Sequence, residues 1–275
     1  MSGASLRGRM DVLDDLRQIV TAMHNLAYAE LQRLGRIEPV VLDAARAVAQ
    51  ALSDTLGREP AAGDVVERAG QPLTLLAIGS ERGFCGGFND AIAEAIAARR
   101  RQPATRWPPR WWVAGDRLRL RTEAMLPDAI YLPSCTSAEE CRSTVQDWLA
   151  VILSAGPLPG RVLEILRHDE RGPRWTRVLP HPELPAPGSH PLRQMPRSRV
   201  LKELAIQAAR VGLLDALVGS LVQESRWRLA QMQRARDHLD DAGSRLRRTY
   251  FRQRQADITG ELQTLMSSLD LLAGD

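Results

Sequence analysis

The chain has 275 residues, of which 44% are hydrophobic and 25% charged, and its net charge is +4. These proportions are those of a folded globular protein and exclude a disordered chain. Its three cysteines are too few for a disulfide scaffold, and their spacing matches no zinc site. We expect no signal peptide and no membrane span, because the longest nearly uncharged run, 211–223, is short and contains Asp215. The sequence therefore predicts a soluble cytoplasmic chain.

Between residues 6 and 56, apolar residues recur at every seventh position without a miss. They are Leu6, Leu13, Val20, Ala27, Leu34, Val41 and Val48. This period predicts a long helix that packs along a partner helix. Gly35 and Pro39 lie near its middle, where we expect a kink or an interruption. Arg17 and His24 fall on the same seam, where a polar residue usually fixes register rather than serving chemistry.

The middle segment, 71–196, alternates short apolar runs with helical patterns. The predicted strands are 73–78, 111–114, 129–132, 161–166 and 175–179, and the predicted helices are 89–101, 116–125 and 137–153. Ser137 and Glu140 have the spacing of a capping box at the start of the last helix. Strands that alternate with helices predict a Rossmann-like α/β domain with a largely parallel sheet.

The last segment, 197–275, contains no proline, and its apolar residues step by three and four. This spacing predicts one helix of about 70 residues, which at 1.5 Å per residue is roughly 110 Å long. Such a helix needs a partner for its seam, and the helix of residues 1–56 supplies one. The fold class that we predict is therefore α/β, with a long antiparallel coiled coil of N- and C-terminal helices and an inserted domain. The seven-residue period predicts a left-handed twist.

A glycine-rich segment follows the first predicted strand and runs from Gly79 to Asn89. Glycines between a strand and a helix hold phosphate in nucleotide-binding proteins. No lysine follows, however, and Gly83, Gly86 and Gly87 miss the dinucleotide spacing. The residues by themselves favour a structural tight turn.

The segment from Ser80 to Asn89 resembles the S-D-R-G-L-C-G-G-x-N motif of the gamma subunits of F-type ATP synthases. Further matches follow in the same order as in that family. Near the N-terminus, the family's R-I and I-T-K-A-M motifs are matched by Arg9-Met10 and by Ile19 to Met23. In the last predicted helix, its E-x-x-x-R-x-x-x-M motif is matched by Glu224, Arg228 and Met232. Its Y-N-R-x-R-Q-A-x-I-T-x-E-L motif is similar to the segment from Tyr250 to Leu262. The departures are Thr21 for lysine, His238 and Phe251 for two asparagines, and Ser268-Leu269 for G-A. These departures raise the alternative of a variant synthase coupled to sodium ions.

The resemblance implies a non-catalytic central-stalk rotor with no cofactor and no metal of its own. Its implied partners are the hexamer of alpha and beta subunits, the epsilon subunit and the c-ring of Fo, on the cytoplasmic face of a bacterial inner membrane. The coupling ion, proton or sodium, stays open. The residues implied at subunit interfaces are Arg9, Met23, Arg82, Cys85, Gly86, Gly87, Asn89, Glu224, Arg228, Met232, Arg252, Arg254, Gln255, Thr259 and Glu261.

Charge along the last helix is uneven, since nine arginines and three acids lie between Arg226 and Arg254. After Gln255 there are four acids and no basic residue. We interpret this arginine band as a surface that meets acidic groups of a surrounding ring. The alternative interpretation is a solvated helix face.

Two other functions stay open as alternatives. The arginine band, together with Trp107, Trp111 and Trp112, raises a nucleic-acid-binding coiled coil, and the α/β domain raises a nucleotide-dependent enzyme. The five histidines are scattered, and no catalytic pairing stands out. Cys135 and Cys141 have the spacing of the regulatory dithiol of plant chloroplast gamma subunits, without the insertion that surrounds it there.

Overall fold

The structure is a computed structural model that describes residues 3–57, 73–102, 108–156, 158, 161–180, 184–188 and 194–272. The chain divides into two compact units. Unit 1 consists of Met1–Leu26 and Ala230–Asp275, and unit 2 of Ala27–Leu229. This division cuts across both terminal helices, so the three segments 1–56, 71–196 and 197–275 stay a sequence-based prediction.

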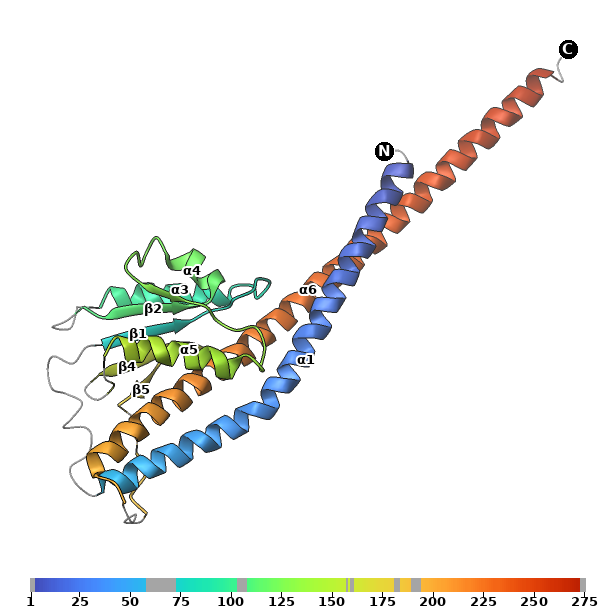
Figure 1. Cartoon of the computed structure of the whole chain (residues 1–275). Coiled ribbons are helices and arrows are strands. Elements are labelled where there is room, and N and C mark those ends of the chain that lie inside the picture. Colours follow the sequence, from blue (N-terminus) through green and yellow to red (C-terminus); the bar gives the residue numbers. More distant parts are fainter. Residues whose placement is uncertain are drawn as a thin grey trace. The chain divides into compact units, whose positions relative to one another are not determined.

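The two terminal helices are α1 (Gly3–Leu56) and α6 (Arg197–Leu272), and each contributes residues to both units (Figure 1). Helix α1 continues through Gly35 and Pro39, so the helix is not interrupted there, and the alternative of a kink stays a prediction. A proline removes one backbone donor from a helix. Here the turns on both sides are held by packing, since Leu34 and Val41 are buried in the core of unit 2.

In unit 1, α1 and α6 pair in antiparallel directions. Arg7 Nη2 donates to Tyr250 Oη at 2.6 Å, and the Arg17 guanidinium meets the Asp240 carboxylate at 2.9 Å. Two apolar residues of the seam, Leu6 and Met232, lie just beyond these contacts at either end and are buried. The predicted pairing of the two terminal seams is thus confirmed, whereas the role of Arg17 in register stays a prediction, since its ion pair lies at the surface.

The described residues of unit 2 form a sheet of five strands in the order β3-β2-β1-β4-β5. The strands are β1 (Leu73–Ile78), β2 (Arg110–Ala114), β3 (Ile130–Leu132), β4 (Val162–Asp169) and β5 (Gly172–Leu179). Neighbours among β1 to β4 run parallel, and β5 is antiparallel to β4. The predicted α/β domain with a largely parallel sheet is confirmed.

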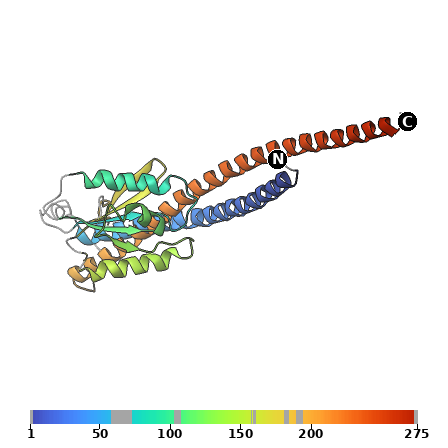
Figure 2. The same cartoon turned by 90° about the horizontal axis from the view of Figure 1, so that it is seen from above.

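Helices cover both faces of this sheet (Figures 1 and 2). One face packs against α3 (Phe88–Arg100) and α4 (Asp116–Thr122), with Ile92, Ile96 and Leu118 in the core. The other face packs against α5 (Cys141–Ser154), α1 and α6, with Trp112, Trp148 and Leu217 in the core. A strand covered on both faces has no solvent side, which is why β1 reads as a continuous apolar run.

The predicted start of α5 is wrong by a few residues. The helix begins at Cys141, and the side chain of its N-cap residue, Glu140, makes no capping hydrogen bond. The Glu140 carboxylate instead accepts the backbone N–H of Thr136 at 2.9 Å, and the Cys141 thiol contacts the Ser137 carbonyl. The Thr136–Glu140 segment is therefore a turn before the helix, and these contacts replace the predicted capping box.

One 18-residue window of α6 reaches a mean hydropathy of 1.5, which is enough by composition to cross a membrane, and half of that window is buried inside the protein. Burial of this kind is typical of the core helix of a globular protein. In the ranges that the structure describes, no group of His, Cys, Asp or Glu is arranged to hold a metal ion. His181, His190 and Trp107 lie outside those ranges.

Candidate functional site

The glycine-rich segment begins at the carboxyl end of β1, where it packs closely against the turn that follows β2. A Cβ on Gly79 would lie 2.2 Å from Leu118 Cβ. Gly115 has φ +101°, and a Cβ there would lie 2.7 Å from the Gly79 carbonyl oxygen. Gly79 is thus required by the close approach of the Leu118 and Asn89 side chains and Gly115 by the close approach of backbone, and neither position needs a phosphate to explain it. This geometry supports the structural turn.

A carboxylate of the chain itself fills the crevice where α/β folds bind anionic ligands. Glu81 Oε2 accepts the backbone N–H of Asp116 at the start of α4 and that of Ser134 after β3, each at 3.1 Å. Backbone N–H groups at this edge are those that would bind a phosphate. Glu81 occupies them, so the arrangement counts against the nucleotide-dependent enzyme.

A buried hydrogen-bond network fixes the base of the loop between Gly79 and Asn89. Asn89 Oδ1 accepts the backbone N–H of Ser80 at 3.0 Å, and Asn89 Nδ2 donates to Ser80 Oγ at 2.8 Å. Cys85 Sγ lies 3.3 Å from Ser80 Oγ, and burial raises the pKa of its thiol. Cys85 and Asn89 are therefore packing and bracing residues, and neither offers a reactive group to solvent.

Helix α6 contacts the same loop through Arg228, which also pairs with Glu224 on α6. Arg228 Nη2 donates to Glu224 Oε1, and Arg228 Nε donates to the Gly83 carbonyl at 3.4 Å. Burial raises the pKa of Glu224 to about 7, although the Arg228 charge acts in the opposite direction. The E-x-x-x-R spacing thus forms an ion pair within α6, and Arg228 of that pair also reaches the loop through the Gly83 carbonyl.

Phe84, at the tip of the loop, is the residue that sequence reasoning missed. Its φ is +64° and its side chain is 64% exposed. Arg82 and Arg117 are also exposed, and the Arg117 guanidinium lies close to Gly83, the residue before Phe84. A left-handed aromatic residue costs about 1–3 kcal/mol of strain, and such strain is concentrated at functional sites. The signal available in the sequence was an aromatic residue between two glycine positions.

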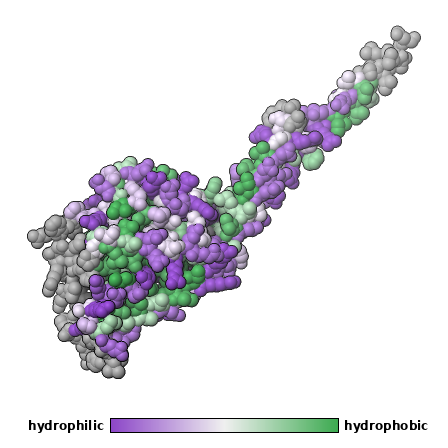
Figure 3. All heavy atoms as spheres, viewed as in Figure 1, coloured by the Kyte–Doolittle hydropathy of each residue, from purple (hydrophilic) through white to green (hydrophobic). Residues whose placement is uncertain are grey.

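A second group of predicted interface residues lies on the last part of α6, in unit 1. Arg252, Arg254, Gln255, Thr259 and Glu261 are all exposed. The same stretch carries exposed apolar side chains, which Figure 3 draws in green. They are Phe251, Ile258, Leu262, Leu265 and Met266.

The remaining predicted residues lie in other settings. Arg9 is exposed and Met23 half-buried on α1, Met232 is buried between the helices, and Gly86 and Gly87 are exposed in the loop. The structure thus brings together the loop residues with Glu224 and Arg228, and separately the residues at the end of α6. Arg9 belongs to neither group.

Part of the arginine band is already paired within the chain. Arg226 meets Glu170 at 2.7 Å, Arg228 meets Glu224, and Arg247 meets Asp14 at 3.5 Å. The nucleic-acid alternative loses support, because Trp112 is fully buried and Trp111 packs edge-on against Trp175. Neither ring is free to stack on a base.

The Cys135 and Cys141 thiols are buried and lie 3.8 Å apart. The hydrogen bond with Cys141, together with burial, raises the pKa of Cys135, which disfavours the thiolate that disulfide formation needs. Regulation by these cysteines stays a hypothesis without geometric support beyond their contact.

Comparisons with known proteins agree with this architecture. The chain matches the ATP synthase family over residues 2–272. It is 25% identical to an ATP synthase gamma chain of Geotalea uraniireducens over 289 aligned positions, covering 98% of both chains. It also resembles rotor and central-stalk chains in structures of the mitochondrial ATP synthases of Euglena gracilis and Tetrahymena thermophila. The Euglena gracilis rotor structure is 12% identical with a TM-score of 0.65. A second Euglena gracilis structure, of OSCP, F1 and the c-ring, is 14% identical with a TM-score of 0.67. The Tetrahymena thermophila structure, of the central stalk and c-ring, is 12% identical with a TM-score of 0.54. These alignments cover 93%, 98% and 79% of this chain and 98%, 94% and 99% of the other.

The fold thus defines a helix-pair protein with an α/β domain inserted in sequence between its two helices. The chain belongs to the ATP synthase family, as a gamma subunit. It is a non-catalytic subunit of the central stalk, since the catalytic sites of the synthase are on the beta subunits.

Proposed function

We propose that this chain couples transmembrane ion flow to ATP synthesis and hydrolysis by rotating within a hexamer of alpha and beta subunits. In this proposal the chain also binds an epsilon subunit and the c-ring of Fo, on the cytoplasmic face of a bacterial inner membrane. The observation that carries the proposal is the last part of α6, which has an exposed apolar stripe and no basic residue after Arg254. An exposed apolar helix end of this kind indicates that other subunits surround it, and we call that surrounding surface the sleeve.

The interface residues divide into two proposed contact surfaces. The first is the loop tip, where Arg82, Phe84, Gly86 and Gly87 make the contacts and the buried Cys85, Asn89, Glu224 and Arg228 hold them in place. The second lies on the helix pair, where Arg252, Arg254, Gln255, Thr259 and Glu261 make the contacts together with Arg9 and Met23. Met232 acts from within the seam.

The direct test is affinity purification of the tagged chain from its own cell membranes, followed by mass spectrometry. We expect ATP synthase alpha, beta, epsilon and c subunits to be retained. The c-subunit sequence recovered in this way also identifies the ion, since proton and sodium sites use different ligands. Recovery of the chain alone, or with nucleic acid, would contradict the proposal.

The arginines at the end of α6 provide a sharper test of coupling. In the double variant Arg252→Glu, Arg254→Glu, we expect ATP synthesis to fall at least tenfold while the complex still assembles, because two attractive charges become repulsive. The matched control is Arg100→Glu, Arg101→Glu, at two exposed arginines in unit 2. Unchanged synthesis in the first double variant would rule out this contact.

A further inference from the structure

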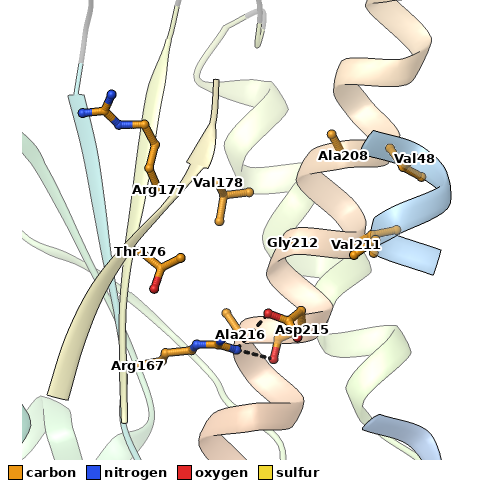
Figure 4. Close-up of a pocket in the computed structure, with 11 residues that line it drawn as sticks. Val48, Arg167, Thr176, Arg177, Val178, Ala208, Val211, Gly212, Asp215 and Ala216 are labelled. Carbon is orange, nitrogen blue, oxygen red and sulfur yellow. Dashed lines mark hydrogen bonds and ion pairs between the residues drawn. The ribbon is translucent and has the colours of Figure 1, made fainter. Parts of the chain in front are cut away.

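Two acidic residues of α6, Asp215 and Glu224, pair with arginines in unit 2, and their surroundings differ. Asp215 pairs with Arg167 of β4 at 2.9 Å on the wall of a pocket of about 180 Å³ (Figure 4). These two side chains are 27% and 24% exposed, so water screens the pair. Glu224 pairs with Arg228 one turn further along the helix, and their side chains are only 6% and 15% exposed. The second carboxylate is therefore ionised in a place where charge is costly.

The balance of forces on the Glu224 carboxyl is close. Burial acts most strongly and raises its pKa to about 7, while the charge of Arg228 acts in the opposite direction. The loop between Gly79 and Asn89 adds two smaller effects, since Glu81 raises this pKa and Arg82 lowers it. The Cys85 thiol of the same loop also faces the carboxyl, and its own pKa is raised mainly by burial and further by Glu224. Glu224 thus changes charge within the physiological pH range.

A second titratable side chain, His168 of β4, packs near the same turn of α6. Its ring lies edge-on to Trp227 at 5.6 Å and stacks on Phe88 at 5.1 Å. Its Nδ1 lies 3.0 Å from the Asp169 carbonyl oxygen, and within the described residues its buried Nε2 has no hydrogen-bond partner. Any effect of pH on this region must therefore be assigned either to the Glu224 carboxyl or to this imidazole.

Arg228 links Glu224 to the tip of the loop. Its Nε donates to the Gly83 carbonyl at 3.4 Å, and the next residue is Phe84, whose φ is +64°. A guanidinium keeps its proton throughout the physiological range. When Glu224 takes up a proton from water, Arg228 becomes a mostly buried cation that has lost its ion-pair partner, and this state is costly. The Glu81 carboxylate is already bound to two backbone N–H groups. Arg228 consequently turns toward solvent, which breaks its bond to Gly83.

We propose that Glu224 is a proton-dependent switch for the tip of the loop. Ionised Glu224 holds Arg228 against the Gly83 carbonyl and keeps Phe84 in its left-handed conformation. Protonated Glu224 releases Arg228, and the tip relaxes. Acid therefore releases the tip and alkali holds it. The switch is a property of the chain alone, whereas its effect on a contact with another subunit rests on the proposed function.

Fluorine NMR of the full chain, labelled with para-fluorophenylalanine, tests the switch. The chain has three phenylalanines, so three resonances are expected, and single substitutions by leucine assign them. Phe84 lies at the tip, Phe88 stacks on His168, and Phe251 lies in unit 1. We expect the Phe84 resonance to move with a midpoint near pH 7, and the Phe251 resonance to show no transition there. A Phe84 resonance that stays constant between about pH 5.5 and 8.5 would overturn the proposal.

Variants assign the transition to one carboxyl. Glu224→Gln keeps the length of the side chain and cannot ionise, so its Phe84 resonance should stay at the acid position at every pH. Asp215→Asn makes the same change in the more exposed ion pair of α6 and should keep the transition. A transition that persists in Glu224→Gln would belong to another group, such as His168, and would overturn the proposal. If Glu224→Gln does not fold, Arg228→Gln decides, because without the guanidinium the Phe84 resonance should also stay at the acid position.

ATP hydrolysis by the assembled synthase separates the switch from the proposed contact of the loop tip. The ionised fraction of Glu224 rises about tenfold between pH 6 and pH 8. We therefore expect Glu224→Gln to lower the ratio of the hydrolysis rates at pH 8 and pH 6 at least threefold relative to the wild type. Asp215→Asn should keep the wild-type ratio. A clear Phe84 transition together with an unchanged ratio in Glu224→Gln would support the switch and overturn the contact that the proposed function assigns to the tip.

Discussion

Phe84 is held in a backbone conformation that an aromatic residue rarely adopts, with φ +64°. The surrounding loop keeps it there through Glu81, the Ser80–Asn89 hydrogen bonds and Arg228. Because the Phe84 side chain is 64% exposed, packing inside the chain offsets little of this strain. The conformation is therefore better explained by a contact outside the chain than by folding.

Phe84→Gly tests this explanation, because glycine adopts positive φ without strain. We expect the isolated chain to gain up to about 1 kcal/mol of unfolding free energy. ATP hydrolysis by the assembled complex should fall, since the aromatic contact is lost. Urea unfolding and a coupled hydrolysis assay measure the two effects. A less stable variant would contradict the strain, and unchanged hydrolysis would contradict the contact.

Glu224 makes stability depend on pH. Burial raises its pKa in the folded chain from 4.5 to about 7. Between these pH values the folded state binds more protons than the unfolded state, so stability falls as pH rises. Relative to Glu224→Gln, we expect the wild type to lose up to about 3 kcal/mol between pH 4.5 and 7.5. Urea unfolding across this range measures it. Glu94→Gln, at an exposed carboxylate on α3, is the control and should show no such trend.

At the scale of elements, the β2–α4 turn packs against the end of β1 because the backbone at Gly115 approaches the backbone at Gly79. Gly115→Ala places a Cβ 2.7 Å from the Gly79 carbonyl oxygen, in addition to the cost of φ +101°. We expect a loss of more than about 2 kcal/mol in unfolding free energy. Gly172→Ala has a similar φ, +125°, but no atom within 4 Å, so about 1 kcal/mol should be lost there. Equal losses in the two variants, compared by urea unfolding, would contradict the role of close approach.

Elements that are specified by neighbouring residues can be predicted from the sequence, whereas contacts between distant residues cannot. The heptad of α1 and the strand–helix alternation are local patterns, and both predicted their elements. Glu81 binds backbone groups 35 and 53 residues away, and no spacing in the sequence indicates those partners. The capping-box rule failed at Ser137 because Glu140 turned back to Thr136. Phe84 was missed because left-handed strain is a property of the folded loop.

At the scale of the whole molecule, the end of α6 is stable only with partners. Arg7 contacts Tyr250, so α1, which begins at Gly3, leaves little helix to pair with the residues after Tyr250. Every side chain from Phe251 to Met266 is exposed. A single helix of this length is marginal in water, and amide hydrogens in such segments exchange by local opening.

Hydrogen exchange measured by mass spectrometry should therefore differ between the isolated chain and the assembled synthase. In the isolated chain, we expect residues 251–266 to exchange at least a hundredfold faster than residues 213–222, which pack in the core of unit 2. In the complex, exchange of 251–266 should slow at least tenfold, because a surrounding sleeve excludes water, while 213–222 stays unchanged. Slow exchange of 251–266 in the isolated chain would contradict the marginal helix. Fast exchange that persists in the complex would contradict the sleeve, because an uncovered helix end would open as readily as in the free chain.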